Sequence, residues 1–439
     1  MDLLENISAE DKRVNGSLEE TLSSFNECSC LREHKLRINM IKIGEGLAGI
    51  TGSLLKKAGF PERLLLVADE NTIAASRGLV ESLKTAGFII KTQIFDNLIS
   101  AKMEDVTMIR GLCPNIGGIL AVGTGSICDV CRYAAFKESK AFAIFATGPS
   151  MDGFASNSAP LIENGFKLTY QARQPEVIIA DTGILAAAPA ELKSAGFGDM
   201  AAKYTALADW RIAHLLTGEY YCPRVAELVL NGLNRVMNLA DRVLKNDPET
   251  AAAMMAGLVM TGVAMSFTGN SRPASGAEHV LSHFWECKKL QAGEWPDFHG
   301  KKTGVASLLI TELYRKLAGR PSVGTHADET DWEKVREAYG GRLAEEMMKL
   351  NRPATVTDDI DPKLLSVKWP EIRRIIFDTL PETNSLRSLL IQAGAATEPR
   401  DIHVDDKLLA QGLKYHAYMR NRVNLTRLMP MLSIKDDDK

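Results

Sequence analysis

Three of the eight histidines in this 439-residue chain, His279, His283 and His299, lie close together in the sequence. His279 and His283 are four residues apart, so on a helix both imidazoles would face the same side. Upstream, Asp199 follows two glycines beside an apolar stretch, a position that suits either a helix N-cap or a metal ligand. One carboxylate and two imidazoles leave a coordination position open for substrate on a divalent metal ion. Ordinary core histidines are the alternative explanation of this pattern.

Two segments rich in glycine and serine each follow an apolar run that suits a buried strand. Residues 121–129 pass from Ala-Val into Gly-Thr-Gly-Ser and then into a helical pattern. Glycines allow a phosphate to approach the backbone, and the N–H groups that begin a helix favour an anion. Residues 147–156 place Asp152 after the next strand, where α/β proteins bind ligands. An ordinary strand-to-helix turn explains the first segment equally well, and a capped loop with Ser150 or Asp152 as N-cap explains the second.

From about residue 37 to 183, short apolar runs alternate with stretches of helical periodicity. The apolar runs are residues 64–68, 88–90, 118–122, 141–145 and 177–180, and the clearest helical stretches are residues 72–86 and 126–137. Buried strands that alternate with helices are typical of βαβ units. We therefore predict an α/β domain with a mostly parallel sheet over residues 37–183.

After about residue 184 the periodicity is helical, and we expect no strand beyond Thr182. The helical stretches are residues 187–216, 224–244, 250–267, 304–317 and 332–350. These patterns predict an all-helical domain over residues 184–439. Residues 1–36 are polar and form a loosely attached lead-in. Between two such domains, ligands usually bind beyond the carboxyl ends of the strands.

Composition excludes several classes of protein. The formal net charge of -3 provides no basic field for nucleic acid or an anionic membrane. Seven cysteines, an odd number, do not form a disulfide framework, so we expect a reduced cytoplasmic protein. The polar N-terminus has no apolar core of a signal peptide. Glycines interrupt the longest apolar stretch, residues 251–267, which predicts a buried helix and no membrane span.

Several segments, in this order and at this spacing, resemble the superfamily of dehydroquinate synthase, glycerol dehydrogenase and iron-containing alcohol dehydrogenases. The likeness is greatest to the bacterial branch of the glycerol-1-phosphate dehydrogenase family. The segments are residues 67–72, 123–129, 147–156, 196–210, 271–283 and 299–304. The resemblance implies a dehydroquinate synthase-like fold, with an α/β dinucleotide-binding domain followed by a helical metal- and substrate-binding domain. It also implies interconversion of dihydroxyacetone phosphate and sn-glycerol 1-phosphate with NAD or NADP, and a homodimer.

The same resemblance implies roles for individual residues. Asp199, His279 and His299 would bind one divalent metal ion, Zn²⁺ or Ni²⁺, with Fe²⁺ as a further possibility. Asp199 and His283 would be catalytic, and Asp152, Asp199 and His283 would contact substrate. The dinucleotide site would comprise Asp69, Asn71, Gly125, Ser126, Ile127, Cys128, Asp129, Thr147, Gly148, Pro149, Ser150 and Ser156.

The substrate phosphate needs cationic partners near the matching segments. Arg272 is the first candidate, because a planar guanidinium binds phosphate with two hydrogen bonds. Lys167, Lys203 and Lys301 are the others. A glycerol or other polyol dehydrogenase with the same metal ligands is the alternative enzyme. A metal- and NAD-binding scaffold without catalysis is the alternative outside enzymes.

Overall fold

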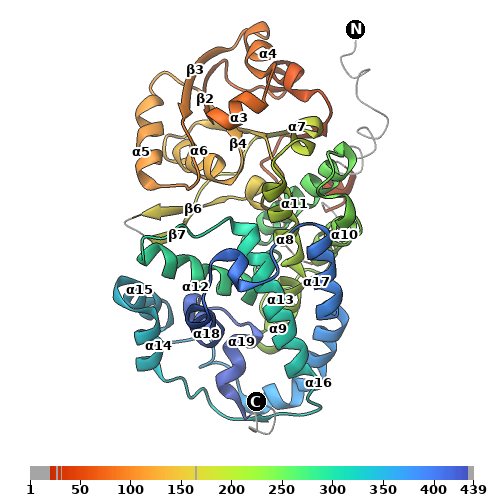
Figure 1. Cartoon of the computed structure of the whole chain (residues 1–439), viewed down its shortest axis with the longest axis vertical. Helices are drawn as coiled ribbons and strands as arrows, with labels where there is room; N and C mark the ends of the chain where they lie inside the picture. Colours follow the sequence, from red (N-terminus) through yellow and green to blue (C-terminus); the bar gives the residue numbers. More distant parts are fainter. Residues whose placement is uncertain (1–19, 26–27, 31, 164–165, 434–439) are drawn as a thin grey trace.

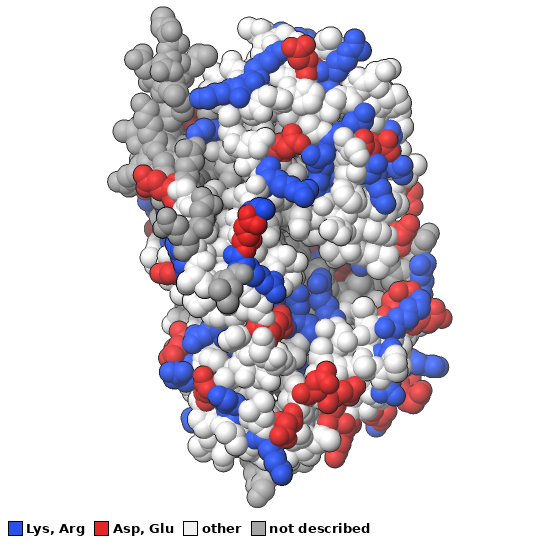
Figure 2. Space-filling view, turned by 180° about the vertical axis from the view of Figure 1, so that it is seen from behind, with Lys and Arg blue, Asp and Glu red and all other residues white. Residues whose placement is uncertain are grey.

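The computed structural model describes residues 20–25, 28–30, 32–163 and 166–433. An α/β unit forms one end of the molecule and a helical unit the other, with a short β-hairpin at their junction (Figure 1). The first 19 residues of the predicted lead-in lie outside the described part. Over the face seen in Figure 2, basic and acidic side chains are interspersed.

Six parallel strands form the sheet of the α/β unit, which confirms the predicted fold class. Its order is β1-β8-β5-β4-β2-β3. The strands are β1 (Met40–Gly44), β2 (Arg63–Asp69), β3 (Ile89–Phe95), β4 (Gly118–Gly123), β5 (Ala141–Ala146) and β8 (Val177–Asp181). Helices cover both faces of the sheet, so its central strands are buried and continuously apolar. That is why β2, β4, β5 and β8 coincide with predicted apolar runs. The edge strand β3 is partly exposed and shares only residues 89–90 with its predicted run, and β1 was not predicted.

Two antiparallel strand pairs depart from the prediction. Strands β6 (Ser158–Glu163) and β7 (Phe166–Gln171) pair antiparallel, and their mixed polar sequence carries no buried-strand signal. The short strands β9 (Gly324–Thr325) and β10 (Leu432–Ser433) also pair, so the expectation of no strand beyond Thr182 is wrong. Both of these strands have only two residues, too few to show a period in the sequence.

Helices α2 (Thr51–Lys57), α3 (Glu70–Ala75), α4 (Leu79–Thr85), α5 (Met103–Leu112) and α6 (Gly125–Lys137) belong to the α/β unit. The single helix expected over residues 72–86 is divided into α3 and α4. Gly78 between them has a φ of 84°, in the left-handed region that glycine adopts without strain. This turn directs α3 away from α4, and the start of α3 stays at the end of β2.

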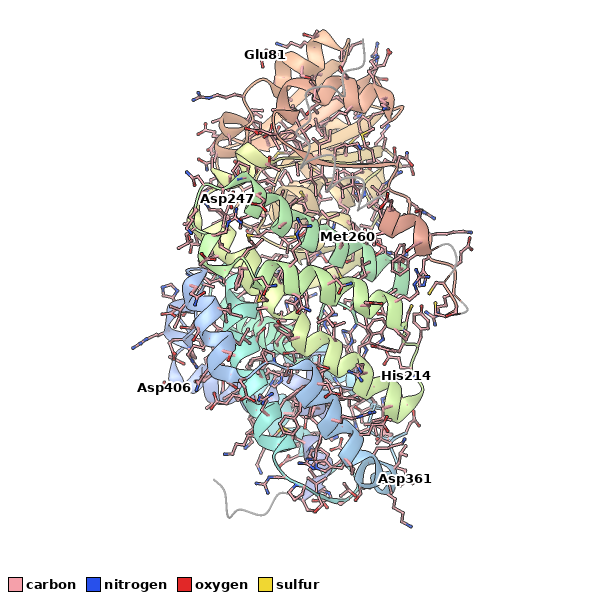
Figure 3. The ribbon with its side chains drawn as sticks, turned by 90° about the vertical axis from the view of Figure 1, so that its right-hand side faces the viewer. Glu81, His214, Asp247, Met260, Asp361 and Asp406 are labelled. Carbon is pink, nitrogen blue, oxygen red and sulfur yellow. The ribbon has the colours of Figure 1, made fainter. Side chains whose placement is uncertain are left out.

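The helical unit follows α7 (Thr182–Ala186), directly after the last strand of the parallel sheet. Its helices are α8 (Ala190–Ala201), α9 (Lys203–Thr217), α10 (Pro223–Met237), α11 (Pro248–Thr268), α12 (Ala277–Gln291), α13 (His299–Ala318), α14 (Trp332–Tyr339), α15 (Gly341–Asn351), α16 (Pro362–Thr379), α17 (Thr383–Gln392), α18 (Asp406–Tyr415) and α19 (Leu425–Leu428). Helix α11 is long and apolar enough to span a membrane, but almost all of its residues are buried inside the protein. Figure 3 shows α11, labelled at Asp247 and Met260, crossing the molecule beneath the α/β unit. It is the buried core helix that the sequence predicted.

The described part of the lead-in packs on the helical unit, in contrast to the loose attachment we expected. The Phe25 side chain is 4% exposed, and its ring centroid lies 4.9 Å from that of Phe267 on α11. Nearby, Arg224 Nη2 donates to Ser24 Oγ at 3.1 Å. The buried Phe25 side chain anchors this segment, and the polar composition around it did not indicate such an anchor.

Glycines allow helices α8 and α13 to approach at backbone distance. A Cβ atom at Gly196 would overlap the carbonyl oxygen of Pro149, and one at Gly198 or Gly300 would overlap backbone of the facing helix. The loop after β5, helix α8 and the start of α13 therefore meet without intervening side chains. This close approach places Asp199 beside His299.

Gly196→Ala should lower the free energy of unfolding by about 1–3 kcal/mol, because the added methyl group has no space beside Pro149. The melting temperature would fall accordingly in a thermal unfolding experiment. Gly111→Ala on α5 is the matched control, since nothing lies within 4 Å of its Cβ position. There alanine should stabilise the helix slightly. Equal melting temperatures for the two variants would contradict the packing role of Gly196.

Candidate functional site

A cavity of about 820 Å³ lies between the carboxyl edge of the parallel sheet and the helical unit. Most of the predicted site residues line it. These are Asp69, Asn71, Gly125, Ser126, Asp129, Thr147, Ser150, Asp152, Ser156, His279, His283 and His299. Strands β2 and β4 are neighbours from which the chain proceeds in opposite directions, and such a point in an α/β sheet opens a crevice for ligands.

His279 and His299 line the helical end of the cavity and meet Asp199, which is fully buried and is not one of the lining residues. His279 Nε2 lies 3.6 Å from Asp199 Oδ1, and His299 Nε2 lies 4.0 Å from the same oxygen. The three ligand atoms all lie within 4.8 Å of one another. This spacing suits ligands that share one ion at about 2.0–2.2 Å each. Asp199 lies inside α8, so it is not the N-cap that the sequence left open.

Glu278 fixes the orientation of the His279 ring. Its Oε1 atom accepts from the Gly276 N–H at 2.8 Å and lies 2.7 Å from His279 Nδ1. With Nδ1 bonded to Glu278, the Nε2 atom of His279 faces Asp199. Burial raises the pKa of Glu278 to about 8 and lowers the pKa of His279 well below its ordinary value. A neutral imidazole held by a carboxyl group is the usual arrangement of a metal-binding histidine.

Lys203 pairs with the carboxylates of both Asp199, predicted to bind metal and substrate, and Asp152, predicted to bind substrate. Its Nζ atom lies 2.8 Å from Asp199 Oδ1 and 2.6 Å from Asp152 Oδ2, and it donates to the Ala274 carbonyl at 3.2 Å. Burial favours a neutral amine, but the two carboxylates outweigh it and raise the pKa of Lys203. Asp199 Oδ2 also accepts the Asp152 N–H at 2.8 Å. Lys203 is therefore engaged by carboxylates, in contrast to its predicted place near phosphate.

His283 lies one turn beyond His279, with ring centroids 6.3 Å apart. Its Nδ1 atom is 3.2 Å from Glu286 Oε2, and Glu286 Oε1 pairs with Lys167 at 3.0 Å and Lys302 at 3.1 Å. Burial lowers the pKa of His283 to about 4, although Glu286 opposes this shift. Burial alone would raise the pKa of Glu286, but Lys167 and Lys302 hold it well below its usual value. His283 is thus neutral near pH 7 and donates Nδ1–H to an ionised carboxylate, which leaves Nε2 as a hydrogen-bond acceptor.

The structure does not bring Arg272 to the cavity. Its guanidinium pairs with Glu219, with Nε 2.7 Å from Oε1 and Nη2 2.5 Å from Oε2, and Nη1 donates to the Val423 carbonyl at 2.6 Å. These hydrogen bonds already use the guanidinium donors that we expected to bind the phosphate. Lys301 is likewise paired, at 3.1 Å from Glu191 and 3.4 Å from Asp297.

Arg420 is a cavity cation that sequence reasoning missed. It lines the cavity, and its guanidinium makes no hydrogen bond or ion pair with any residue that the structure describes. Its charge contributes to the low pKa of both His279 and His283, which places it near the two imidazoles. Arg420 follows α18 in the sequence, far from every predicted motif, and no local pattern marks it.

The N-terminus of α6 faces the cavity at its other end. Its N-cap, Thr124, makes no side-chain capping bond, so the first N–H groups of the helix lack a partner from that side chain. Gly125 and Ser126 line the cavity there. At the end of β2, Asp69 Oδ1 accepts the Thr72 N–H at 2.8 Å and caps α3.

Four residues predicted for the dinucleotide site do not line the cavity: Ile127, Cys128, Gly148 and Pro149. The side chains of Ile127 and Cys128 are buried in the apolar core, where burial raises the pKa of Cys128 to about 12. Burial also raises the pKa of Asp129 to about 7, against the charge of Arg132.

Comparison with known proteins agrees with this geometry. A model of the family described as iron-containing alcohol dehydrogenase matches residues 42–189. In solved structures, the fold is similar to an iron-containing alcohol dehydrogenase from Corynebacterium glutamicum, with a TM-score of 0.59 at 15% identity over 92% of this chain and 98% of that one. It is also similar to a 1,3-propanediol oxidoreductase, with a TM-score of 0.60 at 16% identity over 90% and 95% of the two chains.

In sequence, two relatives match nearly the whole length. The chain is 32% identical to the glycerol-1-phosphate dehydrogenase (NAD(P)+) of Halalkalibacterium halodurans, over 94% of this chain and 97% of that protein. The enzyme of the same name from Geobacillus stearothermophilus matches at 32% identity over the same shares. The resemblance noted in the sequence is therefore confirmed, and the chain belongs to the glycerol-1-phosphate dehydrogenase family.

Proposed function

We propose that this chain interconverts dihydroxyacetone phosphate and sn-glycerol 1-phosphate, with NAD or NADP and one divalent metal ion. The observation that carries the proposal is the shared cavity, which has His279 and His299, beside the buried Asp199, at one end and the start of α6 at the other. Relatives of this length and similarity are named for the same reaction. The lining side chains supply contacts for both reactants.

One carboxylate and two imidazoles suit Zn²⁺, Ni²⁺ or Fe²⁺. A metal ion bound there supplies Lewis acidity at the substrate oxygen, and the nicotinamide supplies the hydride. Asp199 is already ionised for this purpose. Burial would raise its pKa, but Lys203 lowers it.

His283 orients the substrate as a hydrogen-bond acceptor. With a pKa near 4 it carries little positive charge at neutral pH, and its Nε2 atom can accept a bond from a substrate hydroxyl. In the oxidative direction the same atom can take the hydroxyl proton, directly or through water. Asp152, paired with Lys203 at the cavity wall, is placed to accept a second substrate hydroxyl.

The substrate phosphate is held by Arg420, with Lys167 as a second cation. Both line the cavity near His283, and Lys167 pairs with the same Glu286 that orients that histidine. The guanidinium of Arg420 has its donors available, which suits a phosphate dianion. Arg272 is not part of this proposal.

The pyrophosphate of the dinucleotide lies at the N-terminus of α6, where helix N–H groups and the helix dipole favour an anion. Asp69 and Asn71, at the end of β2, contact the adenosine ribose. A carboxylate at this position repels a 2′-phosphate, which supports a preference for NAD.

The seven cysteines are all free, and we propose a reduced, cytoplasmic location for the enzyme. A homodimer is proposed from the resemblance alone, and light scattering on the purified protein would test it.

The proposed reaction predicts NADH oxidation that depends on dihydroxyacetone phosphate and a product of sn-glycerol 1-phosphate configuration. The configuration is checked with a stereospecific sn-glycerol-3-phosphate dehydrogenase, which should leave the product unoxidised. Faster turnover of glycerol than of glycerol 1-phosphate would instead favour a polyol dehydrogenase.

Replacing His299 by alanine should remove the active-site ion and lower kcat/KM by more than about 100-fold, because Asp199 and His279 alone bind metal weakly. Metal content per chain, measured by elemental analysis, should fall by about one ion relative to the unmodified protein. His326→Ala is the control, since its ring bonds the adjacent Ala327 carbonyl outside the cavity. Unchanged metal content in His299→Ala would refute the assignment.

Arg420→Ala should raise the KM for dihydroxyacetone phosphate about 10- to 100-fold. A change of this size corresponds to the free energy of one lost hydrogen bond between charged groups. The KM for unphosphorylated dihydroxyacetone should change little. Steady-state kinetics on both substrates measure the difference, with the exposed Arg400→Ala as control. Equal changes for both substrates would remove Arg420 from the phosphate site.

A further inference from the structure

A second group of metal-ligating side chains lies away from the cavity. Cys28, Cys30 and His34 in the described lead-in meet Cys222, which precedes α10. The four ligand atoms all lie within 4.8 Å of one another. None of the four residues lines the active-site cavity.

Two of three separations within the cluster match the edges of a tetrahedral zinc site, and the third is shorter by about 0.4 Å. With Zn–S near 2.3 Å and Zn–N near 2.0–2.1 Å, neighbouring ligand atoms are about 3.5–3.8 Å apart. Cys28 Sγ lies 3.6 Å from Cys222 Sγ, and Cys222 Sγ lies 3.8 Å from His34 Nε2. Cys30 Sγ lies 3.1 Å from the same nitrogen. A disulfide needs sulfurs about 2.05 Å apart, and all seven cysteines are free.

The ligand set differs in kind from that of the active site. Three thiols and one imidazole complete a tetrahedron, which is the composition of a structural zinc site. Asp199, His279 and His299 are only three ligands and leave a position open for substrate. The cluster also joins distant parts of the chain, since three ligands come from one short segment and Cys222 comes from the loop between α9 and α10.

The surroundings hold the four ligands in place. The Tyr220 hydroxyl lies 3.2 Å from Cys30 Sγ, and the Arg32 guanidinium lies 3.8 Å from the centre of the Tyr220 ring. The His34 ring is enclosed by Phe25 and Phe267, with centroids 5.4 Å and 5.0 Å away. A hydrogen bond to a ligand sulfur and a nearby cation suit a centre with three thiolates and a net negative charge.

We propose that Cys28, Cys30, His34 and Cys222 bind a Zn²⁺ ion that fastens the lead-in to the α9–α10 loop. The same loop carries Glu219, which holds Arg272 ahead of α12. Helix α12 bears His279 and His283, so the zinc site stabilises a loop that supports the active site from outside. In Figure 3 the labelled His214 marks the end of α9, where this loop begins. The ion takes no part in the reaction.

Cobalt(II) distinguishes this site from the active site. The full-length protein exchanged with Co²⁺ should show thiolate-to-cobalt charge transfer in the near ultraviolet and the strong visible absorption of a tetrahedral centre. The active-site ligands include no sulfur and give no such charge transfer. His279→Ala/His299→Ala, which lacks two active-site ligands, should retain both bands and about one zinc ion per chain after purification with zinc.

Cys30→Ser in that background should abolish the charge transfer, remove the retained zinc and lower the melting temperature. Cys113→Ser is the matched control, because Cys113 is a buried thiol outside the cluster. If the Cys30 variant does not fold, a thiol-modifying reagent on the unmodified protein should release the ion to a chromogenic chelator. Absence of charge transfer, no retained zinc in His279→Ala/His299→Ala, or a Cys28–Cys222 disulfide found by mass spectrometry would each overturn the proposal.

Discussion

Burial of the Asp199 charge is the constraint on which the candidate site depends. Its side chain is fully buried, and an isolated carboxylate in such a place would be very costly. Lys203 and the Asp152 N–H both donate hydrogen bonds to it, and a ring nitrogen of each of His279 and His299 lies within 4.0 Å of its Oδ1 atom. Each of these groups comes from a different part of the fold. The same interactions that make the carboxylate tolerable also collect the metal and substrate ligands in one place.

Asp199 and His299 can meet only because the backbones of α8 and α13 are in contact, and glycines leave room for this contact. The sheet contributes from the opposite side, since β2, β4 and β5 end at the cavity and present backbone and small side chains to it. The start of α6, where we propose that the dinucleotide binds, therefore faces the proposed metal ligands across one cavity. In this proposal, local groups hold the two phosphorylated reactants, so a chain with slight negative net charge needs no basic surface.

The two arginines show how tertiary contacts decide a role that composition leaves open. Arg272 lies within a matching segment, yet Glu219 and the Val423 carbonyl occupy its guanidinium. Arg420 lies outside every motif, yet the fold turns it into the cavity beside His283. A guanidinium is available to a phosphate only where no carboxylate has already paired with it.

The alternation of buried strands and helices was predictable from local sequence, because strands covered on both faces are continuously apolar. The grouping of Asp199 with the histidines was also predictable, since a family resemblance preserves residue type and order. Strand β1, the role of Lys203 and the cavity position of Arg420 were not. Nor was the cluster of Cys28, Cys30 and His34 with Cys222, although the first three are close in sequence. The pairing of β1 with β8, of Lys203 with Asp152 and of Cys222 with the lead-in joins positions far apart in the chain, which local periodicity does not encode.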